Sequence, residues 1–170
     1  MTEQHLYLAG GCFWGTQHYF KQVRGVLHTE TGFANGHVDR PTYEQVYTDT
    51  TGHAEAVHIV FDADVVSAEL LLRLFFKAID PTQADGQGHD IGTRYRTGIY
   101  YTDATTAELA RRLLDEEARR YSEPLTTEVA PLKSFFPADD YHQDYLDKHP
   151  DGYCHLPVAL FDYARRANRE

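Results

Sequence analysis

The spacing of apolar and polar residues along the chain predicts where its strands and helices lie. Residues 53–61 alternate in such a way that Glu55 shares one strand face with Val57 and Ile59. Together with shorter patterns of the same kind, this gives predicted strands at residues 6–9, 25–34, 53–61, 99–101 and 126–130.

Apolar residues three and four positions apart predict amphipathic helices. Ser67 can cap the start of one helix, and Asp80-Pro81 should end it because the residue before a proline disfavours helical geometry. The predicted helices are residues 13–23, 41–46, 67–80, 103–121 and 139–148. Residues 81–96 form a long loop rich in glycine and polar residues, and loops of such length are often functional.

These elements mix without a regular strand–helix–strand rhythm. The pattern predicts an α+β fold in which helices pack on a mixed, largely antiparallel sheet. Of the 170 residues, 42% are hydrophobic, which suffices for one domain with its own core over residues 1–170.

The charge balance and the short apolar runs exclude several classes of function. The 16 basic and 26 acidic residues give a net charge of -10, and the basic residues do not cluster. Binding to nucleic acid or to an anionic membrane surface is therefore disfavoured. No unbroken apolar run exceeds four residues, which is too short for a membrane span. The N-terminus also lacks the features of a signal peptide, so we expect a cytoplasmic protein.

The two cysteines, Cys12 and Cys154, are the first candidates for chemistry. They are too few for a disulfide framework, so in a reducing compartment they are either reactive or merely buried. Cys12 follows two glycines and precedes a predicted helix, where backbone N–H groups and the helix dipole favour a thiolate. The alternative is an inert, buried thiol beside two core aromatic residues.

Residues 11–15, with the sequence Gly-Cys-Phe-Trp-Gly, resemble the nucleophile motif of the A-type peptide methionine sulfoxide reductases. Further matches follow in the order of that family, at residues 41–43, 51–55, 88–96, 136–146 and 152–154. The resemblance covers residues 6–155. It implies a two-layer α+β sandwich and a thiol-dependent reductase that acts on the S epimer of methionine sulfoxide, free or in peptides and proteins, to repair oxidative damage.

The resemblance also implies the roles of individual residues. Cys12 is the expected nucleophile, and Tyr43, Glu55 and Tyr95 are expected to bind and protonate the sulfoxide oxygen. Cys154 is the expected resolving thiol, which converts a sulfenic acid on Cys12 into a disulfide. Thioredoxin is the expected reductant of that disulfide, and no metal or organic cofactor is implied.

The remaining implied roles concern substrate binding. Phe13 and Trp14 are expected to hold the S-methyl group, and Asp90 is expected to order the pocket. The chain departs from the family pattern in three places. Phe33 stands where the family usually has Tyr, only one C-terminal cysteine is present where many members have two, and the residues from Leu156 onward match no motif.

The strand pattern bears on Glu55 independently of the resemblance. A carboxyl group on the apolar face of a half-buried strand loses hydration, which raises its pKa. A raised pKa keeps the proton on the group near neutral pH, as a general acid requires. We therefore expect Glu55 to be neutral in the resting protein.

Three other functions remain open from the residues alone. Residues 53–55 contain the His-x-Glu pair of zinc deaminases, although the Pro-Cys-x-x-Cys motif that those enzymes need is missing. A cysteine hydrolase could pair Cys12 with His53 or His142, but no hydrolase signature accompanies them. A non-catalytic interaction domain would need only a buried Cys12 with an ordinary thiol pKa.

Overall fold

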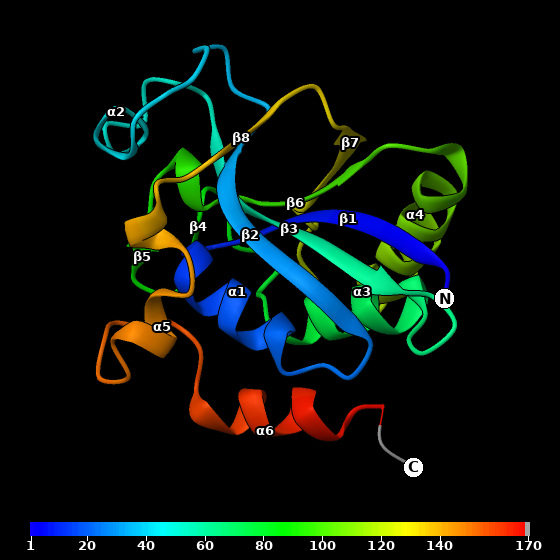
Figure 1. Ribbon diagram of the computed structural model, residues 1–170. Helices are drawn as coiled ribbons and strands as arrows, with labels where there is room; N and C mark the ends of the chain where they lie inside the picture. The colour runs from blue at the N-terminus through cyan, green and yellow to red at the C-terminus, as the bar shows by residue number, and fades with distance from the viewer. Residues whose placement is uncertain (169–170) are drawn as a thin grey trace.

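The computed structural model describes residues 1–168, and a six-stranded sheet forms its centre (Figure 1). Across the sheet the order is β7 (Glu128–Pro131), β6 (Thr97–Tyr101), β1 (Glu3–Gly10), β3 (Ala54–Asp62), β2 (Val26–Ala34) and β8 (Phe135–Pro137). Neighbouring strands are antiparallel except β6 and β7, which run parallel. The prediction of a mixed, largely antiparallel sheet is confirmed.

The helices that follow β1, β3 and β6 pack against the sheet, and the two C-terminal helices pack on the first of them, which confirms the α+β class and the two layers (Figure 1). The helices are α1 (Phe13–Lys21), α2 (Tyr43–Tyr47), α3 (Ala68–Lys77), α4 (Ala104–Ala118), α5 (Tyr145–Lys148) and α6 (Val158–Arg166). None of the helices within residues 1–168 combines the length and the apolarity needed to cross a bilayer.

The core lies between the sheet and the helices. Burying each large apolar side chain there contributes roughly 1.5–3 kcal/mol to stability. Its most buried members include Leu8, Tyr19, Phe20, Val57, Ile59, Phe61, Leu71, Phe75 and Ile99. The opposite face of the sheet carries a smaller cluster, in which Ala9, Ala34, Ala54 and Ala56 pack around the buried ring of Tyr100. Glu55 therefore lies on the same sheet face as Val57 and Ile59, as the alternation predicted.

Local capping explains where the helices begin. Ser67 caps α3, and its hydroxyl accepts the backbone N–H of Leu70 at 3.0 Å, as predicted. The helix ends at Lys77, three residues before the predicted stop at Asp80. The helix predicted from residue 41 begins later, because Thr42 forms the capping box of α2.

The long loop at residues 81–96 contains short regular elements. β4 (Gly86–Gln87) and β5 (Asp90–Ile91) pair antiparallel, and a single 3₁₀ turn follows at Thr93–Tyr95. This compact arrangement holds Asp90 and Tyr95 in fixed positions beside the end of the main sheet.

The prediction of one helix over residues 139–148 is wrong. A 3₁₀ turn at Asp140–His142 and the short α5 take its place, and Asp144 between them has a left-handed backbone with φ 54°. The reason is that the side chain of Gln143 pairs with the backbone of β2 as a neighbouring strand would. The Gln143 amide accepts the N–H of Thr31 at 2.8 Å and donates to the carbonyl of Thr31 at 2.9 Å.

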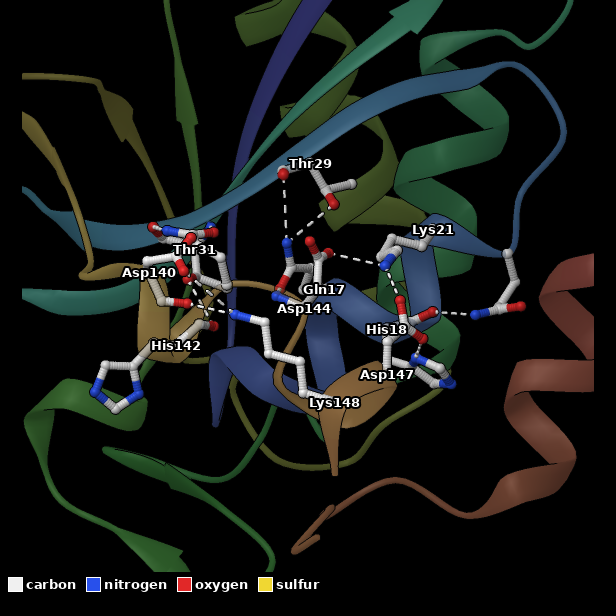
Figure 2. Close-up of polar contacts among 12 residues, drawn as sticks. Gln17, His18, Lys21, Thr29, Thr31, Asp140, His142, Asp144, Asp147 and Lys148 are labelled. Atoms are coloured by element: carbon white, nitrogen blue, oxygen red, sulfur yellow. Dashed lines mark hydrogen bonds and ion pairs between the residues drawn. The ribbon is translucent and has the colours of Figure 1, made fainter. Parts of the chain in front are cut away.

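A second polar contact anchors the same break to α1. The backbone N–H of Asp144 donates to the side-chain oxygen of Gln17 at 2.9 Å, and the Gln17 amide donates to Thr29 of β2 (Figure 2). Lys21 of α1 also pairs with Asp144 and with Asp147. These non-local bonds hold the chain in two turns where a continuous helix was expected.

Besides β4 and β5 within the predicted loop, β8 and α6 were not predicted. β8 is short and pairs with β2 at the edge of the sheet, where three residues carry little periodic signal. α6 packs its buried residues Phe161 and Ala164 toward α1, and the Phe161 ring meets His18 edge-on at 4.6 Å between centroids. The segment after Leu156 therefore packs against α1 as a helix, although it matches no motif of the family.

Candidate active site

Cys12 lies at the N-terminus of α1, directly after β1 and two glycines. Gly11 has a positive φ of 91°, and a Cβ atom there would lie 3.0 Å from Gln87 and 3.1 Å from His155. Glycine is therefore needed for both the turn and the close packing. The turn leaves Cys12 only 5% exposed at the start of the helix.

The expectation that this position favours a thiolate is wrong for the resting protein. The backbone N–H groups of Trp14 and Gly15 lower the pKa of Cys12, as the helix start predicted. Burial acts in the opposite direction and is the larger effect, and the negative charge of Glu55 adds to it. The pKa of Cys12 therefore lies well above its ordinary value, and the thiol keeps its proton at neutral pH.

Glu55 of β3 faces the start of α1. It is 1% exposed, and its Oε1 accepts the backbone N–H of Phe13 at 3.1 Å. Burial raises the pKa of Glu55 to about 8, although the Phe13 N–H and the positive charge of Arg94 lower it. Glu55 is therefore mostly protonated at neutral pH, as its strand position predicted.

Tyr43 of α2 and Tyr95 of the 3₁₀ turn complete a group of proton donors around the thiol. Burial raises the pKa of both tyrosines, and negative charge on Glu55 and Cys12 raises it further. Both hydroxyls therefore stay protonated. The guanidinium of Arg94 lies 4.3 Å from the centre of the Tyr95 ring, and this cation–π contact helps to hold the Tyr95 side chain in place.

An aromatic wall borders the same place. The Phe13 ring lies 5.6 Å from that of Phe33 and 6.4 Å from that of Tyr43. The Trp14 ring stacks on Tyr145 at 3.7 Å between centroids. Phe33 is also the strand partner of Glu55 in the register of β2 and β3, so the residue that departs from the family pattern helps to bury that carboxyl.

Sequence reasoning did not assign the supporting role that His142 has in this wall. Its Nδ1 accepts the indole N–H of Trp14 at 3.2 Å, and its ring stacks on Tyr43 at 4.2 Å. The other histidine considered as a partner of Cys12 is His53. Both of its ring nitrogens are engaged in a loop, with the N–H of Gly36 and the carbonyl of Val38. Neither histidine forms the hydrogen bond to Cys12 that a cysteine hydrolase needs.

Asp90 and Cys154 are the remaining predicted site residues, and the negative charge of Asp90 acts on the Cys12 thiol. The Asp90 carboxylate accepts a hydrogen bond from the hydroxyl of Tyr153 at 2.8 Å, and its second oxygen is buried with no hydrogen-bond partner among residues 1–168. The Cys154 thiol packs on Gly15, because a Cβ atom placed there would lie 3.0 Å from its sulfur. Both cysteines are free thiols. The structure thus brings every predicted site residue to one end of the sheet.

Several neighbours of these residues were given no role in the predicted reductase site, although His142 was considered as a hydrolase partner of Cys12. Arg94, His142 and Tyr153 all lie within the motif stretches that carry the family resemblance, and that position was the only signal available for them.

In the part of the chain that the structure describes, no three His, Cys, Asp or Glu side chains gather as a metal site would require.

A thiol with protonated acids around it can attack a substrate whose oxygen needs a proton, which is chemistry that a thiol-dependent oxidoreductase uses. Comparison with known proteins is more specific. The family model for peptide methionine sulfoxide reductase matches residues 4–169. The peptide methionine sulfoxide reductase MsrA of Clostridium acetobutylicum is 50% identical over 152 residues, which are 89% of this chain and 94% of that protein.

Solved structures agree with the sequence comparison. Mxr1 from Saccharomyces cerevisiae in its reduced form has a TM-score of 0.87 and 31% identity, with 92% of each chain covered. Mxr1 in complex with Trx2 matches with a TM-score of 0.60 and 22% identity over 85% of each chain, which shows a shared fold. The chain belongs to the peptide methionine sulfoxide reductase family, and the predicted enzyme class is confirmed.

Proposed function

We propose that this protein reduces the S epimer of methionine sulfoxide, free and in peptides and proteins, with Cys12 as the nucleophile. The observation that carries the proposal is the neutral Glu55 beside the buried thiol, because a sulfoxide sulfur becomes electrophilic only when its oxygen accepts a proton or a hydrogen bond. In this role the S-methyl group lies against Phe13 and Trp14, and the oxygen lies toward Glu55.

The first step transfers the oxygen atom to Cys12. The sulfur of Cys12 attacks the sulfoxide sulfur while Glu55 gives its proton to the sulfoxide oxygen, with the hydroxyls of Tyr43 and Tyr95 as further donors. The new S–S bond and the S–O bond of the substrate then break as the hydroxyl passes to the sulfur of Cys12, and the electron pair stays on the thioether. The thiol proton of Cys12 replaces the one that Glu55 has lost, so the pocket never holds two negative charges. In balance, a thiol and a sulfoxide become a sulfenic acid and a thioether.

The second step forms a disulfide. Cys154 attacks the sulfur of Cys12, and the sulfenic oxygen leaves as water. Asp90, which hydrogen-bonds Tyr153 next to Cys154, orders this side of the pocket. An external dithiol must then reduce the disulfide, and thioredoxin in the cytoplasm is the reductant that this chemistry favours. The machinery occupies the single catalytic domain expected over residues 1–170.

The test is to supply each epimer of a methionine sulfoxide peptide separately, with dithiothreitol as reductant. Turnover of the S epimer alone, abolished in Cys12→Ser, is the expected result. Equal turnover of both epimers, or activity that survives in Cys12→Ser, would overturn the proposal. A second incubation with thioredoxin, its reductase and NADPH then tests the partner, because NADPH oxidation must depend on the sulfoxide.

A further inference from the structure

His155 lies against both glycines that flank Cys12, at Gly11 and at Gly15. Its Nε2 lies 3.0 Å from the carbonyl oxygen of Gly10. A carbonyl can only accept a hydrogen bond, so Nε2 carries the proton of the neutral ring. The lone pair of the neutral imidazole is therefore on Nδ1.

That Nδ1 atom is buried, and it has no hydrogen-bond partner in the part of the chain that the structure describes. A buried acceptor without a donor is unfavourable, and such atoms are uncommon in folded proteins. Burial also lowers the pKa of His155 against the opposing effects of the Gly10 bond and the negative charge of Asp90. The ring is therefore neutral at physiological pH, with an unprotonated Nδ1.

Nδ1 of His155 and the thiol of Cys154 both lie close to Gly15 of α1. A Cβ atom placed on Gly15 would be 3.1 Å from Nδ1 of His155 and 3.0 Å from Sγ of Cys154. In the reduced protein the sulfur instead receives the backbone N–H of Leu156 at 3.4 Å. Hydrogen bonds of a catalytic base are often absent at rest and form only as the reacting group moves.

We propose that His155 is the general base of the resolving step and takes the thiol proton of Cys154 as its sulfur attacks Cys12. The inference rests on the proposed function, since it requires a sulfenic acid on Cys12. It adds a residue to the second half of the reaction, in which Glu55 and the tyrosines have no assigned part.

The step balances without any external oxidant. The S–H bond of Cys154 breaks, and its proton goes to Nδ1 of His155. The freed electron pair forms the S–S bond, the S–O bond of Cys12 breaks, and the departing hydroxide takes the proton from His155 to leave as water. The sulfur of Cys154 is oxidised as the sulfur of Cys12 is reduced, and the imidazole is neutral again.

A base is needed here because Cys154 is a weak acid. Burial raises the pKa of its thiol, and the negative charge of Asp90 raises it further, whereas the Leu156 N–H lowers it. Only a small fraction of the sulfur is thiolate at neutral pH, and thiolate is the form that attacks. A neutral imidazole that reaches the thiol as the sulfur moves can take its proton and so supply the thiolate.

The test uses His155→Gln, which keeps a donor for the Gly10 carbonyl but removes the base. Each protein is mixed with one equivalent of S-sulfoxide peptide and no reductant, and two products are followed. Methionine release reports the first step, and loss of both free thiols reports the disulfide. The matched control is His28→Gln, which changes an exposed histidine of β2.

The expected result is that His155→Gln releases methionine but forms the disulfide about 10²-fold more slowly near neutral pH. Its disulfide rate should also rise about tenfold per pH unit toward the thiol pKa, whereas the wild-type rate levels off once His155 is neutral. The pH profile separates a lost base from a merely disturbed structure, and His28→Gln should match the wild type in both measurements.

A His155→Gln rate and pH profile equal to those of the wild type would overturn the inference. If the variant does not fold, the wild-type profile decides, because a disulfide rate that climbs tenfold per unit from about pH 6 to pH 9 excludes a neutral imidazole base. Wild-type protein that releases no methionine would instead overturn the proposed function, and the resolving step with it.

Discussion

The two halves of the candidate active site are held in different ways. Cys12 and Glu55 lie at the junction of β1, β3 and α1, where ladder hydrogen bonds and apolar packing fix them. Cys154 lies on the C-terminal segment, residues 139–156, which crosses over α1 with little regular structure. Side-chain hydrogen bonds and ion pairs attach part of that segment, as Figure 2 shows.

This difference matches the demands of the two proposed steps. Proton transfer from Glu55 needs a dry and rigid pocket, since burial is what keeps the carboxyl neutral. Disulfide formation instead requires the sulfur of Cys154 to approach the oxidised sulfur of Cys12 to about 2.05 Å, from a structure in which the two cysteines are unbonded. A segment with few ladder bonds can move for that purpose, whereas a central strand cannot.

The largest effect is expected from removing the thiol of the C-terminal segment. Cys154→Ser should release about one methionine per enzyme without reductant and then stop, with a trappable sulfenic acid on Cys12. Thioredoxin-supported turnover should be lost, and dithiothreitol should restore it because a small thiol can attack the sulfenic acid directly. Mass spectrometry of the trapped protein measures this outcome. Two reactive thiols left in the wild type after exhaustive turnover would contradict the assignment.

The corresponding change in the sheet region is Glu55→Gln. Single-turnover reduction should slow about 10²-fold or more, because the amide keeps the shape but cannot give up a proton to the oxygen. In the wild type the first step should slow as the pH rises past about 8, where Glu55 loses its proton. The variant should lack that decline. Stopped-flow measurement of single turnovers across pH tests both points.

The pH dependence of the free energy of unfolding gives an independent measure of the pKa of Glu55. Its pKa is raised on folding, so its contribution to stability is complete below the pKa of the unfolded chain and is lost as the pH rises toward about 8. Denaturant midpoints of the wild type should fall over that range, and those of Glu55→Gln should fall less. Glu3→Gln, exposed on β1, is the matched control and should behave like the wild type.

A smaller effect should follow from detaching the C-terminal segment. Gln143→Ala leaves the buried backbone N–H of Thr31 without its partner and should cost about 1–3 kcal/mol in the free energy of unfolding. Disulfide formation should slow while methionine release is retained. Urea denaturation and single-turnover assays measure the two effects, with exposed Gln4→Ala as control. Equal slowing of both steps would show that the two regions are not independent.

The smallest effect is expected at the ion pairs of Figure 2. Lys21 pairs with Asp144 and Asp147 on a partly exposed surface, so Lys21→Ala should cost no more than about 1 kcal/mol. The loss should shrink further at about 1 M salt, where screening is strong. Urea denaturation at two salt concentrations measures this, and exposed Lys133→Ala should show neither effect. A cost that is unchanged by salt would point to packing of the lysine stem.

Much of the sheet region could be predicted because its signals are local. Alternation along β3 assigns Glu55 to the inner face, and Ser67 marks the start of α3 through a hydrogen bond to a residue three positions away. The C-terminal segment was predicted poorly for the opposite reason. Its shape depends on Gln143 reaching Thr31, a partner 112 positions away along the chain.

The sequence by itself determined the α+β class, the inward position of Glu55 and, through ordered motifs, the set of residues that meet at the site. Only the tertiary structure decided the protonation of Cys12, because the helix start that lowers its pKa is local, while the larger effect of burial and of Glu55 comes from the packed sheet. The tertiary structure likewise decided that Cys154 and His155 lie against Gly15. Local sequence patterns specify the face of a strand or helix on which a side chain lies. Only tertiary packing specifies which other groups contact that side chain and how completely water is excluded from it.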